Sequence, residues 1–409
     1  MELLGFNKIG KIKKVMIKVD KDYIIKIRRE IHEYPETGFD LPRTTGIVKR
    51  ELESFGIEYT EKYCQGSVVG YINPKKQGFT ICIRADMDAL NMQEEVDLPF
   101  KSKIDGKMHA CGHDAHTAML LGAAKYLKSI EKDLNCRVKL LFQPCEEGPG
   151  SGAIEMVQAG VLEDVDVIIG LHVEDGLHSG ILAVCSGSSQ ASSRNFLVEI
   201  FGKTAHITTP EFGIDALRTA VEAYTNSQKY IAKRRPKDRC AYGFGTLNAG
   251  RTQNNFADYA SMSGTIRTFD MEDDKFVIDS IERAVKEACE KSGATYKITA
   301  PLKCISVYNN PYICTLLEDS FSKVVGKENV KKMHQKMGSE DFSRYVEKKP
   351  GALFRLGIKN PEKGMVSETH LSDFLLDEEV LDLGASAFVQ FVLDNQNGID
   401  MEKIEKSKN

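Results

Sequence analysis

One nine-residue stretch, Met108–His116 (MHACGHDAH), contains three histidines, a cysteine and an aspartate. Thiolate, imidazole and carboxylate groups are the side chains that bind divalent transition metals in proteins. Cys111 and His113 stand two positions apart, so both can face one ion. We interpret the stretch as part of a metal site. His109 and His116 can equally be hydrogen-bonding or helix-start residues, and neither is counted among the predicted ligands.

Further candidate ligands follow apolar segments elsewhere in the chain: Asp86, the pair Glu146–Glu147, and His172. We interpret the segments that precede them as strands, at residues 79–83, 138–142 and 167–171. Helical patterns alternate with these strands, which predicts an α/β domain with a mostly parallel sheet flanked by helices. Ligands of such sheets bind outside the carboxyl ends of the strands. The candidate side chains are therefore expected to converge.

The pair Glu146–Glu147 fits the needs of metal-assisted hydrolysis. Two metal ions together can polarise an amide carbonyl and activate a water molecule. Adjacent side chains of an extended segment diverge, so one carboxylate can bind metal while its neighbour acts as general base. A solvated surface turn is the alternative, but the position of the pair after a strand favours function. His370 is a further candidate terminal ligand, and Asp86 either orients a ligand histidine or caps a local turn.

The pattern changes near residue 193. Strands and helices then follow in the order β-α-β-β-α-β, at residues 196–201, 214–232, 242–247, 260–268, 274–291 and 295–299. This order predicts a ferredoxin-like α+β domain. We therefore expect a discontinuous metal-binding catalytic domain, residues 1–192 and 305–409, with an inserted domain at residues 193–304.

Composition excludes several classes of protein. The 409 residues are 42% hydrophobic and 28% charged, as in ordinary soluble domains. A net charge of -4 argues against nucleic acid as a partner. No apolar run approaches the roughly 20 residues that span a membrane, and we find no secretory signal. The ten dispersed cysteines indicate a reducing compartment. We expect a cytoplasmic protein.

Together, these motifs resemble those of the M20 metallopeptidase/amidohydrolase family. The motifs are Arg84–Leu90 (RADMDAL), Met108–His116, Phe142–Gly150 (FQPCEEGPG), Gly170–His172, Glu340–Phe342 and His370. Their order is that of the family, and the match runs from about His32 to the last predicted helix. The most similar branch contains N-acyl-amino-acid amidohydrolases, hippurate hydrolases, indole-acetyl (IAA)-amino-acid hydrolases and N-acetyldiaminopimelate deacetylases.

The resemblance implies two divalent metal ions per subunit, zinc or manganese, with Glu146 as the general base. The implied ligands are Cys111, His113, Glu147, His172 and His370. It also implies that the inserted domain is a lid and dimerisation domain, so that the protein is a homodimer or a tetramer.

Three residues of the inserted domain match substrate-contacting positions of the family. His206, in the motif Gly202–His206 (GKTAH), is implied to help bind the transition-state oxygen, often in the site of a partner subunit. Asn254 falls where the family has a substrate-contacting asparagine. Arg267 is the candidate for binding the substrate carboxylate, a task that suits its bidentate guanidinium.

The sequence departs from the family pattern near these contacts, at Asn91, at Ile207–Thr209 and at Asn255–Ala257. None of these positions is a predicted ligand, so they bear on specificity rather than on the metal chemistry. We expect hydrolysis of the amide bond of an N-acyl-amino acid, such as an N-acetyl, benzoyl or aryl-acyl compound. The alternative is a di- or tripeptidase or a carboxypeptidase on the same metal centre.

Two other classes of protein fit the sequence less well. A non-catalytic ligand-binding homologue would be expected to lose the base, whereas Glu146 is present. A structural metal module would draw its ligands from a short stretch, whereas these ligands are spread over most of the chain.

Overall fold

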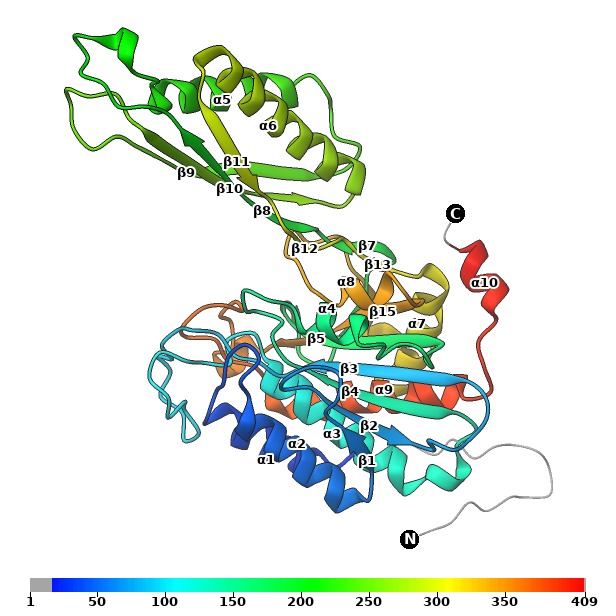
Figure 1. Cartoon of the computed structure of the whole chain (residues 1–409). Helices are drawn as coiled ribbons and strands as arrows, with labels where there is room; N and C mark the ends of the chain where they lie inside the picture. Colours follow the sequence, from blue (N-terminus) through cyan, green and yellow to red (C-terminus); the bar gives the residue numbers. More distant parts are fainter. Residues whose placement is uncertain (1–16, 408–409) are drawn as a thin grey trace, which may run out of the picture. The chain divides into compact units, whose positions relative to one another are not determined.

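The computed structural model describes residues 17–407; residues 1–16 and 408–409, which the predicted catalytic domain includes, lie outside this range. The chain divides into two compact units (Figure 1). Of the described residues, unit 1 contains 17–184, 310–333 and 349–407, and unit 2 contains 185–309 and 334–348. The predicted inserted domain, residues 193–304, lies within unit 2, which extends further.

Unit 1 is built on an eight-stranded sheet with the order β1-β2-β4-β3-β5-β15-β6-β14. Its strands are β1 (Glu58–Thr60), β2 (Val68–Ile72), β3 (Thr80–Asp86), β4 (Arg137–Gln143), β5 (Val167–His178), β6 (Leu182–Val184), β14 (Val330–Lys332) and β15 (Gly351–Lys359). The central strands β4, β3, β5 and β15 run parallel, whereas β2 and β6 pair antiparallel with β4 and β15. Every residue of β3 is buried, as in a strand covered on both faces. The predicted mostly parallel sheet is confirmed.

The helices of unit 1 pack on this sheet and on one another (Figure 1). They are α1 (Lys21–His32), α2 (Pro42–Phe55), α3 (His113–Ser129), α4 (Gly152–Gln158), α7 (Pro311–Val325), α9 (Leu381–Asn395) and α10 (Met401–Lys406). The mostly buried α3 contacts β3, β4 and β5 as well as α1, α2 and α9. Single 3₁₀ turns occur at residues 131–133, 210–212, 327–329, 361–363 and 378–380.

Unit 2 contains the predicted β-α-β-β-α-β arrangement. Its elements are β7 (Gly187–Gln190), β8 (Ser193–Phe201), α5 (Ala216–Ile231), β9 (Cys240–Ala249), β10 (Tyr259–Thr268), α6 (Met271–Ser292), β11 (Thr295–Thr299), β12 (Leu302–Cys304), β13 (Val307–Asn309) and α8 (Ser343–Val346). The antiparallel sheet has the order β11-β8-β10-β9, and β12 also pairs with β8. Helices α5 and α6 contact each other and β10. The ferredoxin-like prediction is confirmed.

One expectation about the sheet was wrong. His172 does not end its strand, because β5 continues to His178. β15 pairs with β5 from Ile168 to Glu174 and, after an irregularity, pairs Lys359 with His178. Glu174 and Asp175 end the apolar run in the sequence, but they do not end the backbone pairing.

None of the helices between residues 17 and 407 combines the length and the apolar composition that a membrane crossing requires.

Candidate metal centre

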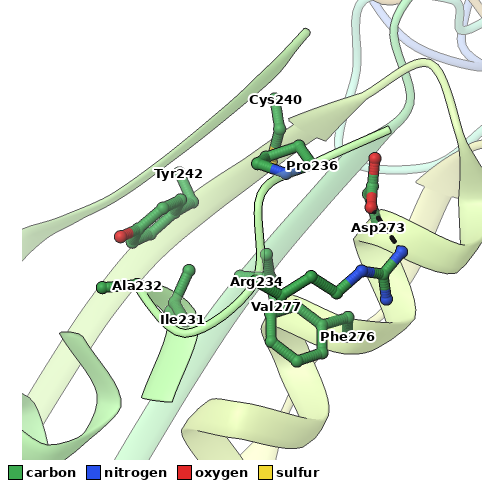
Figure 2. Close-up of a pocket in the computed structure, with 9 residues that line it drawn as sticks. All are labelled: Ile231, Ala232, Arg234, Pro236, Cys240, Tyr242, Asp273, Phe276 and Val277. Carbon is green, nitrogen blue, oxygen red and sulfur yellow. Dashed lines mark hydrogen bonds and ion pairs between the residues drawn. The ribbon is translucent and has the colours of Figure 1, made fainter. Parts of the chain in front are cut away.

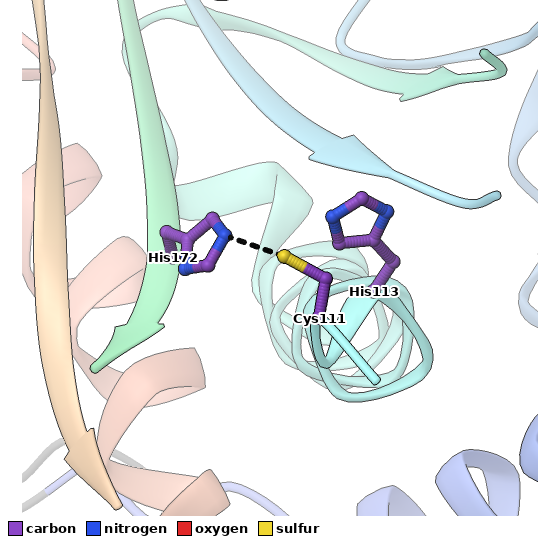
Figure 3. A group of neighbouring side chains, drawn as sticks. All are labelled: Cys111, His113 and His172. Carbon is purple, nitrogen blue, oxygen red and sulfur yellow. Dashed lines mark hydrogen bonds between the residues drawn. The ribbon is translucent and has the colours of Figure 1, made fainter. Parts of the chain in front are cut away.

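Cys111 lies at the centre of the candidate site, within unit 1. Its Sγ is 3.3 Å from Nε2 of His172 and 3.2 Å from Nε2 of His370. Figure 3 shows His172 reaching from β5 toward Cys111, while His113 projects from the first turn of α3. The ligand atoms of Cys111, His113 and His172 all lie within 4.8 Å of one another.

A second group of donors also includes Cys111. Its Sγ, a carboxylate oxygen of Glu147 and a ring nitrogen of His370 lie within 4.8 Å of one another. Nε2 of His370 is 3.1 Å from Oε1 of Glu147. A third such group joins His113, Glu146 and Glu147. The structure thus brings together the five predicted ligands and the predicted base, and their roles remain predictions.

Local backbone conformations hold these side chains in place. Gly112, just before α3, has φ 82°, and a Cβ there would lie 2.6 Å from Cγ2 of Val173. This position therefore requires glycine. Cys145 and His370 also have positive φ, 52° and 68°, which is uncommon for residues other than glycine. Such strain concentrates at functional sites. Here the positive φ of Cys145 sets the direction of the next residue, Glu146, and the positive φ of His370 sets the direction of its own side chain.

Hydrogen bonds fix the presentation of His172. Its Nδ1 donates to the carbonyl oxygen of Val173 at 2.6 Å. The lone pair is therefore on Nε2, which faces Cys111. An imidazole oriented in this way by its second nitrogen is typical of a metal ligand.

His113 provides the test of whether the residues fit a metal ion. Its side chain is completely buried, and neither ring nitrogen has a hydrogen-bond partner among the described residues. The carboxylates of Asp88 and Asp86 lie 3.5 Å from its Nδ1 and 3.8 Å from its Nε2, without hydrogen-bond geometry. A buried polar group without a hydrogen bond is costly, and a bound cation would remove part of that cost. The surrounding thiol, imidazole and carboxylate groups are suitable donors for zinc or manganese. The residues present fit a divalent metal ion.

Asp88 is a functional candidate that the sequence analysis missed. Its carboxylate accepts hydrogen bonds from the backbone N–H groups of Glu146 (2.9 Å) and Glu147 (3.0 Å). Oδ1 of Asp88 is also 3.5 Å from Nδ1 of His113. Asp88 thus holds the segment that carries the predicted base. The two-residue spacing from Asp86, which puts both side chains on one side of an extended chain, could have drawn attention to its position but not to its partners.

The structure resolves the two interpretations of Asp86. Its carboxylate lies 2.6 Å from Nδ1 of His116 and accepts a hydrogen bond from Arg84 at 2.5 Å. The nearest predicted ligand nitrogen, Nε2 of His113, is 3.8 Å away. Asp86 therefore orients a histidine, but that histidine is His116 rather than a predicted ligand.

Burial and neighbouring side chains shift the pKa values of the candidate metal ligands. Burial raises the pKa of the Cys111 thiol, and the Glu147 carboxylate raises it further. The hydrogen bond to Glu147 raises the pKa of His370. Burial alone raises the pKa of Glu147, but His370 and His113 outweigh burial and lower it. Because a metal ion at this position would bind the thiolate, its binding would release the thiol proton.

His109 stays outside the cluster. It belongs to none of the donor groups found among residues 17–407. Burial lowers its pKa to about 3, so the imidazole is neutral. Its exclusion from the predicted ligands agrees with this placement.

The three predicted substrate contacts lie in unit 2. His206 and Asn254 are exposed on neighbouring segments, since the N–H of Ile207 donates to the carbonyl of Asn254 at 3.0 Å. Nη1 of Arg267 donates to Oγ of Ser339 at 2.8 Å, and no described carboxylate forms an ion pair with Arg267. Burial lowers the pKa of Arg267. The guanidinium is thus available to an anion.

Unit 2 also contains a cavity of about 160 Å³ between the end of α5 and the start of α6 (Figure 2). The ion pair on its wall, between Arg234 and Asp273 at 2.7 Å, is already formed. Much of the remaining lining is apolar, including Ile231, Phe276 and Val277. None of the predicted site residues lines this cavity, so the cluster around Cys111 is the better candidate for the functional site.

Comparison with known proteins agrees with this geometry. The model of peptidase family M20/M25/M40 matches residues 82–394. A protein named thermostable carboxypeptidase 1, from Saccharolobus solfataricus, is 39% identical over 90% of this chain and 94% of its own length. A protein named IAA-amino acid hydrolase ILR1-like 4, from Arabidopsis thaliana, is 37% identical over 89% of this chain and 84% of its own length.

A solved structure shares the same fold. The Bacillus subtilis YXEP protein, described as a dinuclear metal binding peptidase from the M20 family, superimposes with a TM-score of 0.76 at 32% identity. The match covers 91% of this chain and 97% of that one. The chain therefore belongs to peptidase family M20/M25/M40 and is a metal-dependent hydrolase of amide bonds.

Proposed function

We propose that this protein hydrolyses the amide bond between an acyl group and an amino acid that keeps a free carboxylate. The convergence of two donor groups on Cys111, with Glu146 beside them, is the observation that carries this proposal. The similarity to a protein named as an IAA-amino acid hydrolase supports this substrate class.

We infer a dinuclear site in which Cys111 is the shared ligand. His113 and His172 complete one set of donors, and Glu147 and His370 complete the other. Two divalent ions bound there would polarise the amide carbonyl and acidify a water molecule. Thiolate and imidazole donors suit zinc, and the carboxylate also suits manganese.

Glu146 is the proposed general base. The residue is buried, with 8% of its surface exposed, and its backbone N–H donates to the carboxylate of Asp88. A carboxylate oxygen of Glu146 lies within 4.8 Å of the ligand atoms of His113 and Glu147. From this position Glu146 takes a proton from the attacking water and returns it to the leaving amine nitrogen.

Unit 2 supplies the proposed substrate contacts. Arg267, which Ser339 holds by a hydrogen bond, binds the carboxylate of the amino acid through its planar fork. His206 donates to the oxygen that becomes negative in the transition state, and Asn254 contacts the substrate. We propose that residues 193–304 act as a lid and as the dimerisation domain of a homodimer.

A carboxypeptidase is the second candidate. The similarity to a protein named thermostable carboxypeptidase 1 favours it, and such an enzyme also needs a group that binds a free carboxylate. The two candidates differ in the group on the other side of the amide bond, which is an acyl group in one case and a peptide in the other.

A hydrolysis screen of the metal-reconstituted protein tests the proposal. The substrates are N-acetyl, N-benzoyl and indole-acetyl derivatives of one amino acid, together with peptides that end in the same residue. We expect the highest kcat/KM with an acyl derivative, and little turnover when its carboxylate is converted to an amide. Faster cleavage of the peptides would instead establish the carboxypeptidase, and no cleavage of any substrate would refute both.

A further inference from the structure

A buried chain of hydrogen bonds joins β3 to β5 through the first turn of α3. Arg84 donates to Asp86 at 2.5 Å, and the other carboxylate oxygen of Asp86 lies 2.6 Å from Nδ1 of His116. The backbone N–H of Val173 donates to Nε2 of His116 at 2.9 Å. These four residues are at most 1% exposed, so water does not compete for the contacts.

The direction of these bonds decides what His116 can do. A backbone N–H only donates, so Nε2 of His116 is the acceptor and Nδ1 carries the proton that is given to Asp86. Both ring nitrogens are therefore engaged. Donor atoms of Asp86, His113 and His116 do lie within 4.8 Å of one another. His116 nevertheless has no lone pair left for an ion, which excludes it as a ligand.

Val173 connects this chain to the metal centre. Its carbonyl oxygen accepts the hydrogen bond from Nδ1 of His172, at 2.6 Å. This bond directs Nε2 of His172 toward Sγ of Cys111, 3.3 Å away. The main chain of Val173 is thus held by His116 on one side, and it orients His172 on the other.

We propose that His116 is a positioning residue, which anchors Val173 and thereby keeps Nε2 of His172 directed at the ion that Cys111 and His113 share with it. This inference rests on the proposed function, because it takes His172 to be a ligand. It assigns His116 a role in metal affinity rather than in the chemical step.

Two amide substitutions separate the two contacts of His116. In His116→Asn the side chain reaches only the place of Nδ1, so it keeps the bond to Asp86 and loses the bond to Val173. In His116→Gln the side-chain oxygen reaches the place of Nε2 and still accepts from Val173. The matched control is Thr117→Val, which removes a buried hydrogen bond to the carbonyl of the same Asp86, 2.9 Å long, without touching Val173.

The measurement is an isothermal calorimetric titration of the metal-free, full-length variants with Mn²⁺, which gives the affinity for each ion. We expect His116→Asn to bind one of the two ions about 10- to 100-fold more weakly than the wild type and to bind the other with unchanged affinity. His116→Gln and Thr117→Val are expected to bind both ions nearly as the wild type does. Equal affinities of His116→Asn and His116→Gln would overturn the inference.

Two further results complete the test. Circular dichroism shows whether each variant is folded. Should His116→Asn not fold, a folded His116→Gln that binds one ion as weakly as His172→Ala would still contradict the inference. The variant His172→Ala separates the two proposals: if it binds two ions like the wild type, His172 is not a ligand and the proposed metal site itself is wrong.

Discussion

His370 follows Cys111 by 259 positions in the chain, yet its Nε2 lies 3.2 Å from Sγ of Cys111. The backbone explains this proximity, because the N–H of His370 donates to the carbonyl of Ala110 at 2.8 Å. The neighbouring N–H of Thr369 donates to Asp175, at 2.6 Å. The turn that contains His370 is therefore hydrogen-bonded both to the loop that contains Cys111 and to β5.

Replacement of Cys111 by alanine is expected to remove metal from the site. The thiolate of Cys111 is the proposed ligand of both ions. The metal content of Cys111→Ala should therefore be less than one ion per subunit, compared with two in the wild type, and the variant should not hydrolyse the substrate. Atomic emission spectrometry of the dialysed protein measures this content. The control is Cys289→Ala, at a buried thiol of α6 in unit 2, which should keep both ions. Two ions retained in Cys111→Ala would refute the shared ligand.

Asp88→Asn tests the support of the base. Asparagine offers one acceptor oxygen, whereas the Asp88 carboxylate accepts from two N–H groups, of Glu146 and Glu147. One buried donor loses its partner, which should cost about 1–3 kcal/mol in the free energy of unfolding. We also expect a lower kcat at saturating metal. Urea unfolding and steady-state kinetics measure both, with Asp133→Asn as an exposed control. An unchanged kcat would show that Asp88 does not position Glu146.

Arg267 is expected to determine affinity for the substrate carboxylate. Arg267→Ala should raise KM about 10- to 100-fold, which corresponds to the loss of a charge-assisted hydrogen bond. Arg267→Lys should recover only part of this loss, because an ammonium lacks the planar fork. With a substrate whose carboxylate is an amide, wild type and variant should differ little. A similar increase in KM for both substrates would contradict the assignment.

Stability should depend on pH through a buried network beside α3. Nδ1 of His32 is 2.7 Å from Asp114, and its Nε2 is 3.1 Å from Glu94. Burial and Arg28 lower the pKa of His32, but the two carboxylates outweigh them and raise it above its ordinary value of 6.5. Protonated His32 therefore stabilises the fold fully below pH 6.5, and this stabilisation is lost as the pH rises through the raised pKa.

The variant His32→Gln measures this contribution. The difference in Tm between wild type and variant should be largest at pH 5 to 6 and should shrink toward pH 9. A difference that stays constant over this range, or grows with pH, would show that His32 is not held protonated in the folded protein.

The sequence alone predicted much of this site, for an identifiable reason. Cys111 and His113 belong to a short stretch that is dense in potential metal ligands, and the pair Glu146–Glu147 follows an apolar strand. Their types and positions therefore both indicated a metal site. The order of elements likewise predicted the sheet of unit 1 and the β-α-β-β-α-β arrangement of unit 2. Short strands of three or four residues, such as β6 and β14, have too little periodicity to be recognised.

What the sequence could not provide was the direction of hydrogen bonds. Asp88 acts on backbone N–H groups, which leave no trace in the residue pattern. The sequence left open whether Asp86 orients a ligand histidine or caps a local turn, and only the structure shows that its partner is His116. The prediction that His172 ends its strand was wrong, since the pairing of β5 with β15 continues past the end of the apolar run.

The central claim is that Glu146 acts as the general base beside two bound metal ions, and Glu146→Gln tests it most directly. Metal content and hydrolysis of the best N-acyl-amino acid are measured on the same reconstituted sample. We predict two ions per subunit, as in the wild type, with a kcat reduced about 100- to 10,000-fold. A variant that holds both ions and still hydrolyses the substrate at the wild-type rate would contradict the account.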